Sequence, residues 1–261
     1  MNDLLANLSH VRPTVRPVTK RAQLAEPDVL LKHGALREPA RAHLSQLRVG
    51  DVACALPIRT VRSVHGQPHY AGRYWSATTR THVVFESRLE LARLLLADFD
   101  PDVVGIVGQP FQMIAEVKGR VRRHVPDYFL LRKDGTALIV NVKPANQAVK
   151  PKVAEALEWP RRLLVELGWD YEVWTGVEGQ RLANVRFLAG YRRPDIAPLD
   201  ETVLSGVMDG DSIVGVELRE ADRRPAGVVR RVLMRALWEQ RLVCDLDNAP
   251  LDGGTVLRRA V

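Results

Sequence analysis

The chain has 261 residues, of which 46% are hydrophobic, so it can form one large domain or two smaller ones around a real core. Its net charge of +7 is compatible with a nucleic-acid partner. No apolar run approaches the about 18 residues of a membrane span, and the N-terminus lacks a signal-peptide pattern, so we expect no membrane association.

The basic residues are mostly arginine. Arginine outnumbers lysine by 31 to 7, and its planar fork pairs with phosphate through two hydrogen bonds. A GC-rich bacterial genome produces the same bias, so composition alone leaves nucleic-acid binding at about even odds. The two cysteines, Cys54 and Cys244, are far apart and have no metal-type spacing, which favours a reducing cytoplasm without disulfides.

Residues 1–75 are predicted to be an N-terminal basic arm or subdomain, because they are polar and contain scattered prolines. Residues 84–98 follow as a helix, since apolar residues recur at helical spacing from Phe85 to Phe99. Within this helix Glu86 is assigned to the first turn, and Glu90 lies one turn further.

Residues 111–117, 121–131 and 137–142 are predicted to form a three-stranded antiparallel meander. The Asp134-Gly135 pair between two apolar runs indicates a tight turn. A second helix over 153–167, interrupted or kinked at Pro160, and a strand over 171–174 complete the pattern. We therefore predict an α/β domain over residues 76–193.

A composition shift at residues 192–198 predicts a domain boundary, which separates residues 194–261. This tail contains three predicted helices, at 199–208, 211–221 and 227–240. Two short strands follow, at 242–246 and 255–259. That order is the outline of a winged-helix-like domain, which binds DNA in some proteins and docks partner proteins in others.

Acid and base side chains stand at the two ends of the Asp-Gly hairpin. Asp127 opens its first strand and Lys143 closes its second, so the fold brings them near each other. Phosphodiester hydrolysis needs a divalent cation, an activated water and a group that positions that water. Asp127 and the Val142 carbonyl can ligate Mg²⁺, Lys143 can orient the water, and Glu90 can complete the metal shell.

Four motifs carry a resemblance to a known family. They are residues 85–90 (FESRLE), 99–104 (FDPDVV) followed by 109–111 (QPF), 122–129 (RRHVPDYF) and 140–144 (VNVKP). In this order they resemble the TnsA-like heteromeric transposase endonuclease subunits, which have a restriction-endonuclease-like nuclease fold, a mixed β-sheet flanked by helices. The family also carries a C-terminal winged-helix-like domain.

The resemblance implies that Glu90, Asp127 and Lys143 are catalytic. It implies Mg²⁺ as cofactor, with Mn²⁺ as a substitute, and cleavage of double-stranded DNA at transposon ends. A companion RNase-H-like transposase subunit and an ATPase regulator are the implied protein partners. The protein is then cytoplasmic, and nucleoid-associated when it is assembled on DNA.

Asn141 departs from the usual nuclease pattern, in which an acid occupies this place. Its amide oxygen can still ligate a cation, so the expected metal ligands are Glu90, Asp127, Asn141 and the Val142 carbonyl, with weaker binding than a full acidic triad gives. Glu86 is the fallback acid, although a capping role at the helix start is the better interpretation.

Seven basic or polar side chains are candidates for contact with DNA. They are Arg122, Arg123, His124, Lys150, Lys152, Arg231 and Arg235. Each of them also has a plain interpretation as a solvated surface residue.

The leading hypothesis is a Mg²⁺-dependent endodeoxyribonuclease subunit of a bacterial DNA-transposition complex. One alternative is a catalytically weakened DNA-binding or assembly subunit of that complex, which Asn141 motivates. Another is a stand-alone nuclease of restriction or repair type.

Overall fold

A computed structural model describes residues 26–34, 38–59, 70–177 and 179–260. The chain folds into two compact units. Unit 1 comprises residues 1–93 and 102–176, and unit 2 comprises residues 94–101 and 177–261. The architecture is mixed α/β, and no helix among the described residues is long and apolar enough to cross a membrane.

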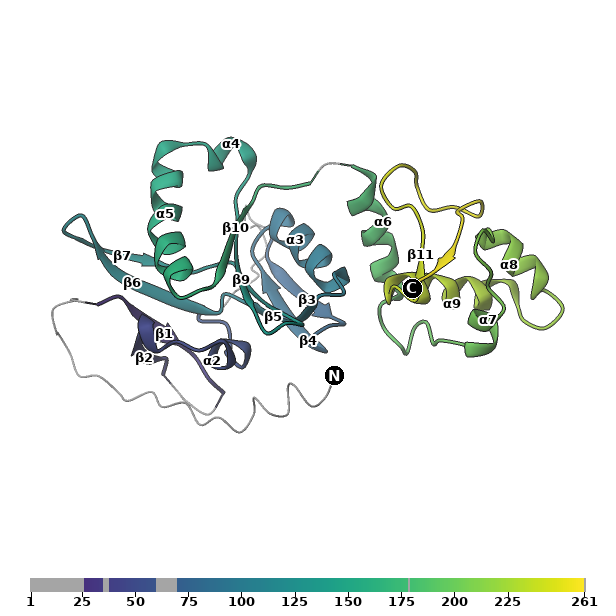
Figure 1. The fold of residues 1–261 in the computed structure, drawn as a ribbon, viewed down its shortest axis with the longest axis horizontal. Helices are drawn as coiled ribbons and strands as arrows, with labels where there is room; N and C mark the ends of the chain where they lie inside the picture. Colours follow the sequence, from purple (N-terminus) through teal and green to yellow (C-terminus); the bar gives the residue numbers. More distant parts are fainter. Residues whose placement is uncertain (1–25, 35–37, 60–69, 178, 261) are drawn as a thin grey trace. The chain divides into compact units, whose positions relative to one another are not determined.

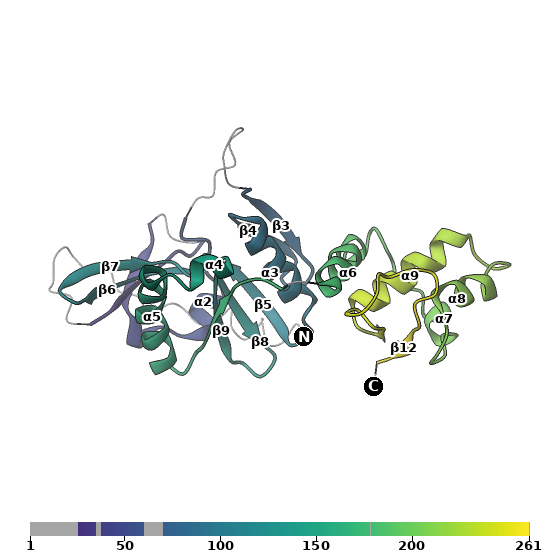
Figure 2. The same cartoon turned by 90° about the horizontal axis from the view of Figure 1, so that it is seen from above.

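Unit 1 contains two four-stranded sheets and a separate hairpin (Figures 1 and 2). Its strands are β1 (Asp28–Leu31), β2 (Ala40–His43), β3 (Gly72–Ser76), β4 (Thr81–Phe85), β5 (Val103–Gly108), β6 (Phe111–Val117), β7 (Arg120–His124), β8 (Tyr128–Arg132), β9 (Ala137–Val142) and β10 (Asp170–Trp174). Its helical segments are η1 (Leu44–Gln46), α2 (Val49–Ala53), α4 (Ala145–Ala148), α5 (Pro151–Glu166) and the first half of α3 (Arg88–Phe99).

The first sheet has the strand order β2-β1-β6-β7, and all of its pairs are antiparallel. The second sheet has the order β10-β9-β8-β5, in which β10 runs parallel to β9 and the other pairs are antiparallel. Among the described strands, β3 and β4 pair only with each other. The second sheet is therefore mixed, as the sequence predicted.

The predicted three-stranded meander is wrong in one respect. Residues 121–131 do not form one strand, because the extended strand is interrupted at Val125, Pro126 and Asp127. The part before the break is β7, which pairs with β6 in the first sheet. The part after it is β8, which pairs with β9 in the second sheet. Pro126 lacks the N–H that a continuous ladder would need, which explains the break.

The main core of unit 1 lies between the two sheets and α5. Alternate residues of β8 and β9, such as Phe129 and Ile139, are fully buried there together with Phe111 of β6 and Leu164 of α5. The intervening residues face the other side of the second sheet, where the Tyr128 hydroxyl donates a hydrogen bond to the Glu90 carbonyl of α3 at 3.2 Å.

The helix α5 continues through Pro160. The predicted interruption of this helix at Pro160 is therefore wrong.

Unit 2 is mainly helical. Its segments are α6 (Gln180–Leu188), η2 (Ala189–Tyr191), α7 (Glu201–Ser205), α8 (Ile213–Arg219) and α9 (Ala226–Trp238), followed by the antiparallel strands β11 (Leu242–Val243) and β12 (Arg258–Arg259). The second half of α9 is almost wholly buried, from Val232 to Trp238. α9 is thus the apolar centre of this unit.

The boundaries of the two units differ from the predicted ranges 1–75, 76–193 and 194–261. β1 pairs with β6, so the described part of the predicted N-terminal subdomain belongs to unit 1; residues 1–25 and 60–69 lie outside the described residues. Residues 179–193 belong to unit 2, because the buried Asn184 amide donates to the carbonyls of Leu246 and Ala249. The sequence does not reveal these bonds, since Asn184 is an isolated polar residue.

Candidate active site

Asp127 lies where the two sheets of unit 1 meet. Its backbone N–H donates to the Val140 carbonyl at 3.1 Å, and its carbonyl accepts from the Gln109 N–H at 2.9 Å. The ladder pairs Tyr128 with Val140, so Asp127 is opposite Asn141 on the neighbouring strand. The backbone of Asp127 is therefore held from both sides, by the end of β5 and by β9.

The carboxylate of Asp127 meets the end of β9. Its Oδ2 atom accepts a hydrogen bond from the Val142 N–H at 2.6 Å and lies 3.7 Å from Lys143 Nζ. The Lys143 ammonium donates to the Val142 carbonyl at 2.9 Å. The structure thus brings together the predicted acid, the predicted base and the predicted carbonyl ligand.

Burial controls the titration of this carboxyl. Desolvation raises the pKa of Asp127 above its ordinary value, although the Lys143 charge and the Val142 N–H act to lower it. The Asp127 side chain is only 18% exposed, whereas that of Lys143 is 38% exposed. The acid is enclosed, and the lysine faces solvent from the rim of the site.

Glu90 is in the first turn of α3, because this helix begins at Arg88 and not at residue 84 as predicted. The Ser87 hydroxyl accepts a hydrogen bond from the Glu90 N–H at 3.0 Å and donates one to Glu90 Oε1 at 2.9 Å. Glu90 Oε2 accepts from the Glu86 N–H at 2.7 Å. The capping carboxylate is therefore Glu90, and Glu86, which was given that role, precedes the helix.

Glu90 also interacts electrostatically with the strand ends. Desolvation is the largest influence that raises its pKa, and the negative charges of Asp127 and Glu86 raise it further; the Glu86 N–H acts in the opposite direction. Carboxylates that repel one another in a partly dry site favour a bound cation. The negative charge of Asp127 therefore reaches Glu90.

Asn141 is 1% exposed, and neither atom of its amide has a regular hydrogen-bond partner among the described residues. It shares its face of β9 with Lys143, two residues further. The amide is near enough to His124 and Tyr171 to influence both of their pKa values. An unpaired buried amide beside ionisable groups is the arrangement of a polar site and not of an apolar core.

His124 does not behave as a phosphate-binding residue. Burial lowers its pKa to about 4, so the imidazole is neutral at neutral pH. Its ring packs edge-on against Trp159 of α5 at 6.1 Å. We therefore remove His124 from the predicted DNA-binding residues, because a neutral ring inside the unit offers no charge to a phosphate.

The other candidate DNA-contacting residues divide by exposure. Arg123, Lys150, Lys152 and Arg231 are exposed, and Arg122 is half-buried. Arg235 is buried, with its guanidinium bound to the Glu239 carboxylate and to the Arg192 carbonyl. Arg235 is therefore part of the internal structure of unit 2, and the expectation that it contacts DNA is not supported.

Two residues of the site escaped the sequence analysis in this role. Ser87 holds Glu90, and the pattern Ser-x-x-Glu before an apolar helix would have indicated this capping box. Gln109 holds the Asp127 carbonyl from a backbone with φ of 48°, and its buried side-chain oxygen has no hydrogen-bond partner among the described residues. No local pattern signals that second role, since it depends on β5 pairing with β8.

The atoms of this site that could bind a metal ion are oxygen atoms. Among the described residues, no three side chains of His, Cys, Asp or Glu come together so that they could hold a metal ion. The carboxylates of Glu90 and Asp127 and the Val142 carbonyl remain as donors. Mg²⁺ takes one or two carboxylates and keeps several waters, so this set suits a weakly held Mg²⁺ better than a fully protein-bound cation.

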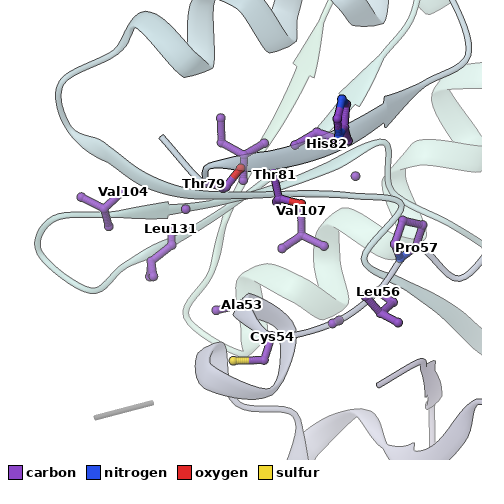
Figure 3. A pocket seen from close by; sticks show the side chains of 15 residues that line it. Ala53, Cys54, Leu56, Pro57, Thr79, Thr81, His82, Val104, Val107 and Leu131 are labelled. Atoms are coloured by element: carbon purple, nitrogen blue, oxygen red, sulfur yellow. The ribbon is translucent and has the colours of Figure 1, made fainter. Parts of the chain in front are cut away.

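A separate pocket of about 250 Å³ lies between α2, the β3–β4 hairpin and β5 (Figure 3). Cys54, Thr79, His82 and Val107 are among its lining residues. Glu90, Asp127 and Lys143 do not line it, so the candidate active site is an open position at the strand ends and not this pocket.

Comparison with known proteins bears on the same region. Residues 100–176 match the family described as TnsA-like endonuclease N terminal. A search of curated proteins finds no significant match. The matched residues run from the end of α3 through β10, so they contain Asp127, Asn141 and Lys143 but not Glu90. Over this segment the chain is similar to the TnsA-like endonucleases, which confirms the resemblance that its motifs predicted.

Proposed function

We propose that the chain is a Mg²⁺-dependent DNA endonuclease subunit of a heteromeric transposase, which hydrolyses phosphodiester bonds at transposon ends. The observation that carries this proposal is the meeting of Asp127 with Lys143 at adjacent strand ends, inside the segment that matches the endonuclease family. Nuclease chemistry needs this combination of acid, base and an open position for phosphate.

The residues of the chain have distinct roles in this mechanism. The Val142 N–H fixes the Asp127 carboxylate, and Ser87 and the Glu86 N–H fix Glu90, so both acids are oriented before substrate arrives. Lys143 uses one of its three N–H donors on the Val142 carbonyl. Its remaining donors can orient a water or a phosphate oxygen beside Asp127, whose Oδ2 atom is 3.7 Å from the ammonium. A bound Mg²⁺ would supply charge neutralisation and a more acidic water, held by Glu90, Asp127, the Val142 carbonyl and Asn141.

The partners are also part of the proposal. We infer that unit 1, a restriction-endonuclease-like core, acts on double-stranded DNA. A companion RNase-H-like transposase subunit cuts the other strand, and an ATPase regulates the complex on DNA in the cytoplasm. Unit 2 is a winged-helix-like domain in this proposal, because helices α7, α8 and α9 precede the two-stranded sheet of β11 and β12. The burial of α9 favours docking through its other elements.

The test is cleavage of transposon-end DNA by the reconstituted complex. The Asp127→Asn variant should lose strand cleavage by at least about 100-fold and keep its thermal unfolding midpoint. Asp134→Asn is the matched control, because Asp134 is an exposed turn residue of the same hairpin. Cleavage by Asp127→Asn at the wild-type rate contradicts the proposal.

A second candidate function is a DNA-binding or assembly subunit that does not cut. Asn141 in place of a second acid, and the small set of carboxylates, favour this alternative. Titration with Mn²⁺ separates the two, because a nuclease should bind the ion in a way that Asp127→Asn abolishes. A stand-alone nuclease is the third candidate, and it should cut DNA without the companion transposase.

A further inference from the structure

The turn between β6 and β7 is open to solvent. Lys118 and Gly119 form its tip with φ values of 52° and 72°, and nothing lies within 4 Å of the position that a Gly119 side chain would take. Figures 1 and 2 show this hairpin at an outer end of unit 1. We call residues 116–124 the cationic hairpin.

The charge of the hairpin is strongly one-sided. Its basic residues are Lys118, Arg120, Arg122 and Arg123, and its one acid is Glu116. Lys118 pairs with Glu155 of α5 at 2.7 Å, where both side chains are exposed. Within the described part of the chain, the three arginines have no carboxylate within ion-pair distance. Their charge is therefore available to a partner.

Helix α5 adds two cations beside the hairpin. Lys152 is three residues before Glu155, so it lies on the same side of the helix as the partner of Lys118. Lys150 immediately precedes the helix, whose N-terminus carries a partial positive charge. Both lysines are exposed. The basic surface thus continues from the strand to the helix start.

The exposed edge of β7 restricts the kind of partner. β7 is the last strand of its sheet among the described strands, so its outer edge pairs with no described strand. A bare edge can accept a strand from another protein, but basic side chains along an edge oppose such pairing. They attract a polyanion instead, and a two-stranded ribbon fits the major groove of a DNA duplex, which is about 12 Å wide.

The hairpin is joined directly to the candidate active site. β7 leads through Val125 and Pro126 to Asp127, so the tip is eight residues from the acid. At about 3.3 Å per residue this is at most roughly 26 Å, since β7 ends at His124, and such a distance spans about eight base pairs of duplex. A duplex whose scissile phosphate is at Asp127 would therefore extend past the hairpin.

We propose that the cationic hairpin, together with Lys150 and Lys152, is a docking surface for the duplex DNA that flanks the cleaved bond. The proposal rests on the proposed function, since it assumes that a phosphodiester is placed at Asp127. It adds the location of the duplex and the residues that hold it.

The experiment measures binding of the full chain to a duplex of about 30 base pairs in the presence of a chelator, over a series of salt concentrations. The test variant is Lys118→Gln/Arg120→Gln/Arg123→Gln. The matched control is Arg73→Gln/Arg80→Gln/Lys133→Gln, which removes the same charge from exposed residues on other elements of unit 1.

We expect the hairpin variant to raise the Kd at least about tenfold and to reduce the salt slope by about two to three, since each phosphate contact contributes about 0.9. The control should change the Kd by less than about threefold. Equal losses in both variants, or unchanged binding in the hairpin variant, overturn the proposal. If the hairpin variant keeps its DNA binding but no longer binds the companion transposase, the hairpin contacts a protein partner, and this result also overturns the proposal.

Failure of the proposed function is distinguishable from these outcomes. Because binding is measured without divalent cation, the result does not depend on cleavage. If Asp127→Asn still cuts DNA while the hairpin variant has lost binding, the nuclease site is wrongly assigned and the docking surface stands.

Discussion

The Ser87 hydroxyl and the Glu90 carboxylate hold each other in a reciprocal arrangement, with Ser87 Oγ 2.9 Å from Glu90 Oε1 and 3.0 Å from the Glu90 N–H. One serine therefore begins the helix and orients the acid. These two effects should separate by measurement, because only the second concerns catalysis.

The Ser87→Ala variant is expected to lose about 1 kcal/mol of unfolding free energy, as is usual for loss of a helix cap. It should also need more Mg²⁺ for half-maximal cleavage, because Glu90 is no longer held. Ser212→Ala is the control, since Ser212 caps α8 in unit 2 through the Gly215 N–H at 3.1 Å. An unchanged Mg²⁺ requirement in Ser87→Ala limits Ser87 to a structural role, and Ser87→Thr should restore both properties.

Lys143→Ala should reduce cleavage by at least about 100-fold with little effect on stability, because its ammonium is partly exposed and makes a single close contact. Lys133→Ala is the comparison. Lys133 is on the turn between β8 and β9, where it forms an exposed pair with Asp102 at 3.8 Å, and its removal should leave cleavage unchanged. Rates in the reconstituted complex decide the point, and equal rates for both variants exclude a catalytic Lys143.

Asn141→Asp would restore the acid that many nucleases of this type have. The new carboxylate would be buried opposite Asp127, so we expect about 1 to 3 kcal/mol of destabilisation in chelator. Excess Mn²⁺ should recover that loss, and the affinity for Mn²⁺ measured by calorimetry should rise above that of the natural chain. If excess Mn²⁺ does not relieve the destabilisation of Asn141→Asp, the side chain at position 141 does not ligate the cation.

His124 predicts a pH dependence of stability. Its pKa is about 4 in the folded chain and near 6.5 when unfolded, so the unfolded state binds the extra proton between these values. The contribution of neutral His124 to the unfolding free energy should be complete above about pH 6.5 and should be lost as the pH falls toward 4. The contribution is about 2 kcal/mol after allowance for partial solvent screening. Denaturant unfolding of His124→Gln should show a flatter profile in this range, and parallel profiles contradict the assignment.

Arg235→Gln should destabilise unit 2 by about 1 to 3 kcal/mol, because the buried guanidinium pairs with Glu239 and with a backbone carbonyl. The DNA affinity of the folded variant should be unchanged. Arg231→Gln is the matched control on the same helix. Arg231 is exposed and bonds only its own helix, at the Gly227 carbonyl. Thermal unfolding of the two variants distinguishes an internal arginine from a surface one.

The sequence predicted the meeting of Asp127 with Lys143 and the resemblance to the TnsA-like endonucleases, because these depend on local motifs and their order. It also placed the helix at α5, the strands β9 and β10, and the helix–helix–helix–hairpin order of the tail. It missed the division of residues 121–131 between two sheets, because strand partners are chosen by long-range packing and no local pattern records them. It also assigned Arg235 to the surface, since a helical arginine gives no sign of the carbonyl that will bury it.

The break at Val125 and Pro126 makes the length of the hairpin independent of the position of Asp127. The register of β8 is set against β9 and β5, while β6 is the one partner of β7 in the part of the chain that the structure describes. Residues can therefore be inserted into or removed from the Lys118-Gly119 turn in pairs, without a shift of the acid. Chains that share this core are free to diverge in hairpin length, and so in the stretch of duplex that the proposed docking surface would cover, while Asp127 and Lys143 keep their places.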